Sequence, residues 1–142
     1  MKSEQDPELT PDSRNLHKLV SLAAGNLMPK AVQRNSFIVN EVPREFQIAA
    51  DETIVATILN SLLTTVVNNS KHSCIRVKAR EYEDVIFVSV RDNNSDRNYD
   101  VNGNLEEINL LAKKMNGTVI IENIDEKMTT ILLSFPNFPK AA

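Results

Sequence analysis

The chain has 142 residues, of which 42% are hydrophobic and 25% are charged, and this composition is typical of one globular domain with a sizeable core. Its formal net charge of -3 and its scattered lysines and arginines exclude the basic footprint of a nucleic-acid-binding protein and argue against a membrane-surface patch. No apolar run approaches bilayer length and the charged start MKSEQDPE is unlike a signal peptide, so we expect a cytoplasmic protein.

The first predicted element is a helix near the N-terminus. Residues 1–9 are polar and are expected to form a disordered tail. Thr10, followed by proline, is a helix-start signal, because a hydroxyl caps the helix and proline suits its first position. Apolar residues at helical spacing follow, and Pro29 either ends the helix near Leu27 or leaves it kinked as far as Gln33.

Two short strands and a long helix come next. The runs 36–42 and 45–50 predict a hairpin or two edge strands. Asp51 is placed to cap a second helix over residues 52–70, whose apolar residues form one broad ridge. This helix is therefore expected to pack on the core.

The C-terminal half alternates hairpins with one helix. A hairpin is predicted over 73–80 and 85–91, and the second of its strands is apolar enough to be central in a sheet. A third helix is expected to begin at Asn104, with Glu107 in capping-box spacing. Gly117 is placed as its C-terminal stop.

The last predicted hairpin comprises residues 118–123 and 128–135. Paired strands between long helices indicate an α/β (α+β) two-layer sandwich: a mixed, mostly antiparallel sheet of about six strands, with three helices on one face. Residues 10–136 are expected to form this single domain, and residues 137–142 a C-terminal tail.

The polar side of the second helix is unusual because it carries no charge. It consists of small neutral side chains, namely Thr57, Ser61, Thr64, Thr65 and Asn68. An exposed helix face usually carries lysine and glutamate, so this stripe indicates partial cover. It either lines a cavity or an interface, or lies under the loop of residues 92–103.

Three further residues are candidates for chemistry. Asp92 ends an apolar strand, where its carboxylate could accept a hydrogen bond from an amine of a ligand or simply cap the following turn. His17 is an ordinary helix residue or, less favoured, a phosphoacceptor. Cys74 and the two histidines are too far apart in sequence to predict a metal site.

Four segments, in order along residues 12–136, resemble the ATP-binding catalytic domain of sensor histidine kinases, the Bergerat or GHKL fold. DETIVATILNSLLTTVVNNS is similar to the family helix that carries the N-box, and VSVRDNN to the strand that ends in the Asp-x-Gly-x-Gly box. LLAKKMNGTVIIEN resembles the helix that ends in Gly-Gly-Thr together with the next strand, and MTTILLSFP resembles the closing strand.

The resemblance implies where ATP or ADP, with Mg²⁺, would bind. Asp92 matches the acid that accepts a hydrogen bond from the adenine amine, and Thr129 matches the threonine near the base. The N-box asparagine that helps hold Mg²⁺ falls on Thr65, and an earlier asparagine of that box falls on Ser61. Asn94 stands at the first glycine of the glycine box.

The departures from the family pattern lie on the phosphate side. Asn94 and Asp96 replace both glycines of the box, where the backbone must approach the nucleotide closely. The region of the glycine-rich lid is DVNGNLEE, so Glu106 and Glu107 would face a phosphate. Thr65 is a poorer Mg²⁺ ligand than an amide or carboxylate oxygen. No metal site is predicted.

These losses favour a stand-alone, degenerate histidine kinase-like ATPase domain without phosphoryl-transfer activity, and the length leaves no room for a complete kinase. The domain would bind a signalling protein, such as a response regulator or a sensor kinase, through Thr57, Ser61, Thr64 and Asn68. The domain could also bind a second copy of itself as a homodimer. The alternatives are a catalytic domain that binds ATP or ADP and acts in trans, and a histidine phosphotransfer protein that uses His17.

Overall fold

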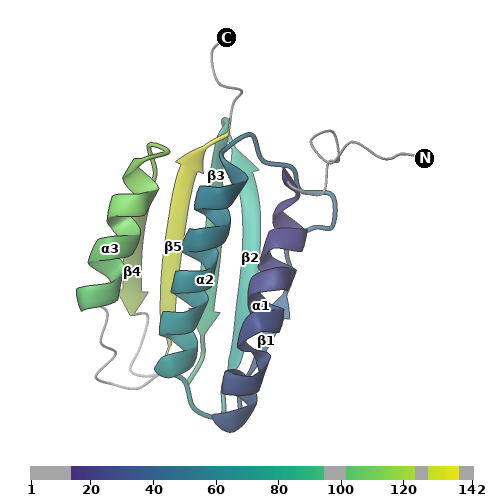
Figure 1. Ribbon diagram of the computed structural model, residues 1–142, viewed down its shortest axis with the longest axis vertical. Coiled ribbons are helices and arrows are strands. Elements are labelled where there is room, and N and C mark those ends of the chain that lie inside the picture. The colour runs from purple at the N-terminus through teal and green to yellow at the C-terminus, as the bar shows by residue number, and fades with distance from the viewer. Residues whose placement is uncertain (1–13, 95–101, 124–127, 138–142) are drawn as a thin grey trace.

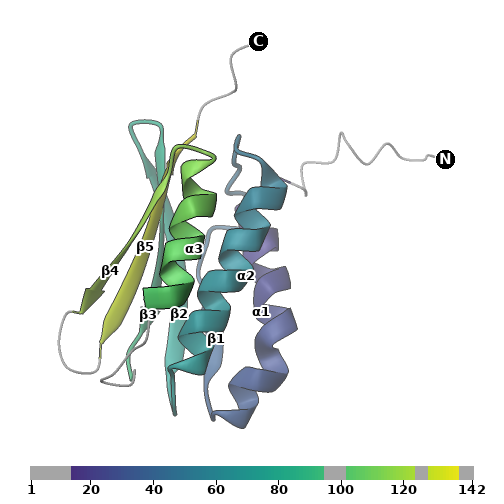
Figure 2. The same cartoon turned by 60° about the vertical axis from the view of Figure 1, so that its left-hand side comes forward.

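The computed structural model describes residues 14–94, 102–123 and 128–137. Three helices lie side by side on one face of a five-stranded sheet, and the other face carries no described helix (Figures 1 and 2). The elements are, in chain order, α1 (Leu16–Gln33), β1 (Phe37–Asn40), α2 (Glu52–Asn68), β2 (Cys74–Tyr82), β3 (Val85–Asp92), α3 (Asn102–Lys113), β4 (Thr118–Asn123) and β5 (Thr129–Pro136).

The sheet has the strand order β1-β2-β3-β5-β4, with one parallel pair, β1 with β2, and three antiparallel pairs. The predicted two-layer α/β sandwich is confirmed, and the described strands number five where about six were expected. β3 is the middle strand, as its nearly continuous apolar sequence predicted.

The predicted strand over residues 45–50 is wrong, and so is its hairpin with 36–42. Only an isolated bridge joins Gln47 to Asn15, and the Leu16 N–H donates to the Phe46 carbonyl at 2.8 Å. The segment therefore pairs with the chain just before α1. β1 ends at Asn40; the Glu41 N–H still donates to the Val77 carbonyl at 2.8 Å, and the Val42 N–H donates instead to the Asn40 side chain at 3.1 Å.

The start of α1 also differs from the prediction. Asn15, in an extended conformation, caps the helix, and its side chain accepts from the Lys18 N–H at 2.9 Å. Thr10, the predicted cap, lies outside the described residues. The helix continues through Pro29 to Gln33, so the longer of the two predicted alternatives is correct.

α2 is the helix that the sequence predicted best. Asp51 caps it as expected, accepting from the N–H groups of Thr53 and Ile54. Its apolar ridge is buried against the sheet: Val55, Ile58, Leu59, Leu62, Leu63, Val66 and Val67 are all at most 1% exposed. No described helix is long and apolar enough to cross a membrane.

Both ends of α3 need correction. The helix begins at Asn102, so Asn104 lies inside its first turn and is not the cap. At the other end the left-handed residue is Asn116, with φ of 60°, and not Gly117. Gly117 is required for another reason: a Cβ there would lie 2.6 Å from the Ser134 carbonyl oxygen on β5.

The chain ends of the domain are tied to the rest of the fold. Asn137, the first residue of the predicted C-terminal tail, donates its N–H to the Asp84 carbonyl at 2.7 Å. Its side-chain oxygen accepts from the Ala49 N–H. The predicted N-terminal tail, residues 1–9, lies outside the described residues.

Candidate functional site

Asp92 lies at the end of the central strand β3, between Ile75 on β2 and Thr129 on β5. Its side chain is among the few buried charged groups described and is only 1% exposed. Both carboxylate oxygens are bound by the protein itself. Oδ2 lies 2.6 Å from the Ser70 hydroxyl, whose single proton is shared between this oxygen and the Val66 carbonyl, also at 2.6 Å, and Oδ1 accepts from the Ser73 hydroxyl.

The two serines come from the connection between α2 and β2. Antiparallel pairing places the start of β2 beside the end of β3, with Ile75 opposite Asp92. Residues just before β2 must therefore lie at the Asp92 carboxylate. Sequence reasoning missed Ser70 and Ser73, because their place at Asp92 follows only from the observed β2–β3 register.

The turn after β3 is fixed to the same connection. The Asn94 N–H donates to Asp92 Oδ1 at 3.1 Å, the local bond of an Asx turn. The Asn94 side chain donates to the Lys71 carbonyl, and the Asn93 side chain accepts from the Cys74 N–H at 3.3 Å. Asp92 thus also has the turn-capping role that its sequence allowed. Asp96 lies outside the described residues.

Thr129 lies directly opposite Asp92 in the β3–β5 register and is 3% exposed. The two residues that the family resemblance assigns to adenine are therefore neighbours at one end of the sheet. Both are buried, and Asp92 lies beneath the protein's own polar groups.

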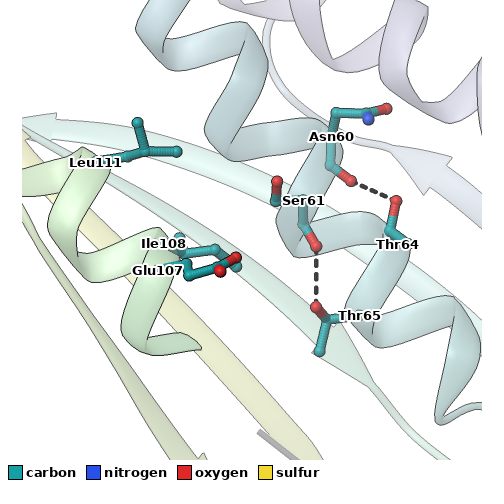
Figure 3. A pocket seen from close by; sticks show the side chains of 7 residues that line it. All are labelled: Asn60, Ser61, Thr64, Thr65, Glu107, Ile108 and Leu111. Carbon is teal, nitrogen blue, oxygen red and sulfur yellow. Dashed lines mark hydrogen bonds between the residues drawn. The ribbon is translucent and has the colours of Figure 1, made fainter. Parts of the chain in front are cut away.

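A separate cavity of about 180 Å³ lies between α2 and α3 (Figure 3). The residues that line it are Asn60, Ser61, Thr64, Thr65, Glu107, Ile108 and Leu111. Three residues of the predicted neutral stripe thus belong to its wall. The other two, Thr57 and Asn68, are exposed on α2 and do not line it.

The hydroxyls in this α2–α3 cavity bond to their own helix. Thr64 Oγ1 donates to the Asn60 carbonyl at 2.6 Å, and Thr65 Oγ1 donates to the Ser61 carbonyl at 3.0 Å. Thr65 is also 2% exposed. Across the cavity, the Glu107 side chain extends from α3 toward α2 (Figure 3).

The described part of the α2–α3 cavity is small and carries one acidic side chain. Pockets for small molecules and cofactors usually have volumes of about 300–1,000 Å³, well above that of this cavity. Its one described carboxylate, Glu107, would repel phosphates, and Thr65 is only 2% exposed. Asp92 and Thr129 are not in the described lining.

His17 lies on α1, on the far side of α2 from the cavity (Figure 1). Its ring is half-buried, and Nδ1 lies 2.7 Å from the Val42 carbonyl oxygen. Since a carbonyl only accepts, Nδ1 carries the proton of this hydrogen bond. The histidine therefore joins α1 to the segment after β1.

No protein-family model and no curated protein sequence matches the chain. Solved structures do match. The Acinetobacter baumannii histidine kinase AdeS has a TM-score of 0.77 at 9% identity, over 87% of this chain and 66% of that one. The catalytic domain of histidine kinase ThkA has a TM-score of 0.74 at 15% identity, over 87% and 92% of the two chains.

The full-length ShkA, solved in complex with AMPPNP, gives a TM-score of 0.74 at 18% identity, over 90% of this chain and 31% of that one. The chain thus spans slightly less than two thirds of the AdeS structure and about a third of ShkA. Identities this low establish the fold alone. The chain has the fold of the catalytic, ATP-binding domain of histidine kinases.

Proposed function

We propose that this chain is a binding module built on the histidine kinase ATPase fold, which acts without phosphoryl transfer in a cytoplasmic, two-component type signalling circuit. The observation that supports the proposal most directly is the burial and hydrogen bonding of Asp92. The carboxylate expected to recognise adenine is 1% exposed and accepts hydrogen bonds from Ser70 and Ser73.

The cost of freeing Asp92 supports this reading. The carboxylate already accepts from Ser70, Ser73 and the Asn94 N–H and is 1% exposed, so an adenine amine could reach it only if this cover moved; each bond to a charged group that is lost costs about 1.5–3 kcal/mol. The Ser70 hydroxyl would keep the Val66 carbonyl at 2.6 Å as its acceptor, and the Ser73 hydroxyl would keep only the longer contact to Asn93 Oδ1 at 3.2 Å. Adenine binding would thus have to offset the loss of any hydrogen bond to the Asp92 carboxylate that it displaces.

The docking surface that we propose is the outer side of the neutral stripe on α2, with the loop of residues 92–103. Thr57 and Asn68 are exposed, and Ser61 and Thr64 are half-buried at the rim of the α2–α3 cavity. The α2 part of this surface carries no charged side chain that would have to be desolvated. It would suit a signalling protein, such as a response regulator or a sensor kinase, whose contacting side chains are small and uncharged.

A measurement of the melting temperature with and without nucleotide tests whether the chain binds ATP or ADP. We expect the melting temperature to stay unchanged with millimolar ATP or ADP and Mg²⁺, because a ligand stabilises only a protein that binds it. A clear rise would contradict the proposal. The Asp92→Asn variant then identifies the place: loss of the rise would assign the nucleotide to Asp92, and an unchanged rise would assign it elsewhere.

Partner binding is tested with purified receiver and kinase dimerisation domains from the same organism. If the α2 surface is the docking site, the double variant Thr57→Arg, Asn68→Arg should weaken the interaction at least about 10-fold, since buried unpaired charges cost several kcal/mol. Asn26→Arg, an exposed change on α1, is the matched control and should bind normally. An equal loss of affinity in the double variant and in the Asn26→Arg control would place the interface elsewhere.

A nucleotide-binding protein that acts in trans is the second candidate. The observation that favours it is the direct register of Asp92 with Thr129, the pair expected at adenine. This candidate predicts the thermal shift that the first excludes, and predicts that Asp92→Asn abolishes it.

A further inference from the structure

The helix-free face of the sheet (Figure 2) has a hollow of its own, far from the helices that cover the other side. It has a volume of about 120 Å³, room for several water molecules or one small oxyanion. Five side chains from three adjacent strands line it: Arg76 and Lys78 on β2, Ser89 and Arg91 on β3, and Thr130 on β5.

The strand register explains why these side chains meet. Arg76, Arg91 and Thr130 lie opposite one another in a row across β2, β3 and β5. Lys78 and Ser89 form the next row on the same face, because side chains two residues apart point to the same side. The β-face hollow is thus framed by a rigid part of the sheet rather than by a loop.

The charges of the hollow are not balanced. Arg76 and Arg91 are directly opposed across two strands, a pairing of like charges that destabilises a sheet. Glu41 pairs with Arg76 at 2.5 Å and approaches Lys78 at 3.9 Å, but Arg91 has no ion pair among the described residues. Glu122, opposite Thr130 on β4, does not line the hollow.

The second, independent observation is the hydroxyl of Thr130. The residue is 8% exposed, and its Oγ1 is the one buried side-chain polar atom, among the described residues, that has no hydrogen-bond partner. Buried hydroxyls are nearly always hydrogen-bonded, so an unpartnered one on a residue that lines the hollow is a donor that a bound ligand could use. It stands beside the guanidinium that lacks a carboxylate.

We propose that the β-face hollow binds a phosphate group, either inorganic phosphate or a small phosphate monoester. The Arg91 guanidinium offers two parallel N–H donors to phosphate oxygens, the geometry in which arginine binds them best. Thr130 Oγ1 donates to the same group, and Arg76 and Lys78 supply the remaining positive charge. This site is separate from the α2–α3 cavity and does not depend on the function proposed above.

Titration of the full chain with inorganic phosphate, followed by calorimetry at constant ionic strength, tests the proposal. We expect saturable binding that Arg91→Gln weakens about 10-fold or more, because a charge-assisted hydrogen-bond donor is lost. Thr130→Val is the second variant. It removes the hydroxyl at nearly constant shape, so it should weaken phosphate binding while leaving the melting temperature without ligand unchanged or higher.

Arg80→Gln is the matched control, because Arg80 lies on the same strand and face but outside the hollow, over the Phe87 ring. It should change the affinity by no more than about twofold. Absence of saturable binding, or an equal loss in Arg80→Gln, would overturn the proposal. A parallel titration with glycerol 3-phosphate distinguishes the two sources: tighter binding than inorganic phosphate assigns a monoester, and weaker binding assigns free phosphate.

Discussion

Among single residues, Asp92 bears most directly on whether the chain binds a nucleotide. An acid at the end of a strand can cap a turn, hold a ligand, or do both. The structure gives this one a serine hydroxyl on each oxygen and a local turn bond from Asn94. Burial makes these bonds valuable, because water cannot replace them when they are broken.

The substitution Asp92→Asn should therefore lower the free energy of unfolding by about 1–3 kcal/mol, because the bonds from Ser70 and Ser73 lose their charged acceptor. Chemical denaturation measures this loss. Asp84→Asn, the same change at an exposed turn residue with φ of 65°, should have almost no effect. Equal stability of the two variants would show that the carboxylate is not structurally engaged.

Among the helices and strands, the predictions were correct where contacts within the element decide its structure, and wrong where contacts with distant segments decide it. The position of α2 follows from its own sequence, since Asp51 and the apolar ridge are local signals. Residues 45–50 carry a strand-like pattern, but their backbone groups bond to Arg14 and Leu16, far away in the sequence. The role of Gly117 was also hidden, because it depends on the approach of β5.

Gly25 and Gly117 give a matched pair of substitutions with effects of opposite sign. Gly117→Ala should destabilise the fold by about 1–3 kcal/mol, since the added Cβ would lie 2.6 Å from the Ser134 carbonyl oxygen. Gly25→Ala meets no atom within 4 Å in α1 and should stabilise it by about 0.5–1 kcal/mol. Thermal denaturation of both variants checks the signs, and a tolerated Gly117→Ala would refute the close approach.

The outer edge of β4 is closed by a side chain of α3. The Asn109 amide donates to the Val119 carbonyl at 3.0 Å and accepts from the Val119 N–H at 2.9 Å, as a neighbouring strand would. Asn109→Asp opposes two acceptors at the Val119 carbonyl, so it should cost about 1–3 kcal/mol. Faster hydrogen exchange of the Val119 amide would accompany it, whereas the exposed Asn26→Asp should leave that amide protected.

At the scale of the whole molecule, alternating helices and paired strands were enough to predict a two-layer sandwich, because each layer buries the apolar face of the other. The neighbourhood of Asp92 and Thr129 could be predicted from the family resemblance. The serines that cover Asp92 could not be, because their role appears only when the β2–β3 register is fixed. The same holds for the β-face hollow, whose residues are scattered over β2, β3 and β5.

We infer that the fold of a kinase ATP-binding domain is used here without its nucleotide. Backbone amide NMR spectra recorded during a titration with ATP and Mg²⁺ test it most directly. If no nucleotide binds, we expect the amide signals of Asp92, Thr129 and Thr65 to stay in place up to millimolar nucleotide. Saturable shifts of these three signals together would contradict it, because they would place a bound nucleotide between α2 and the end of β3.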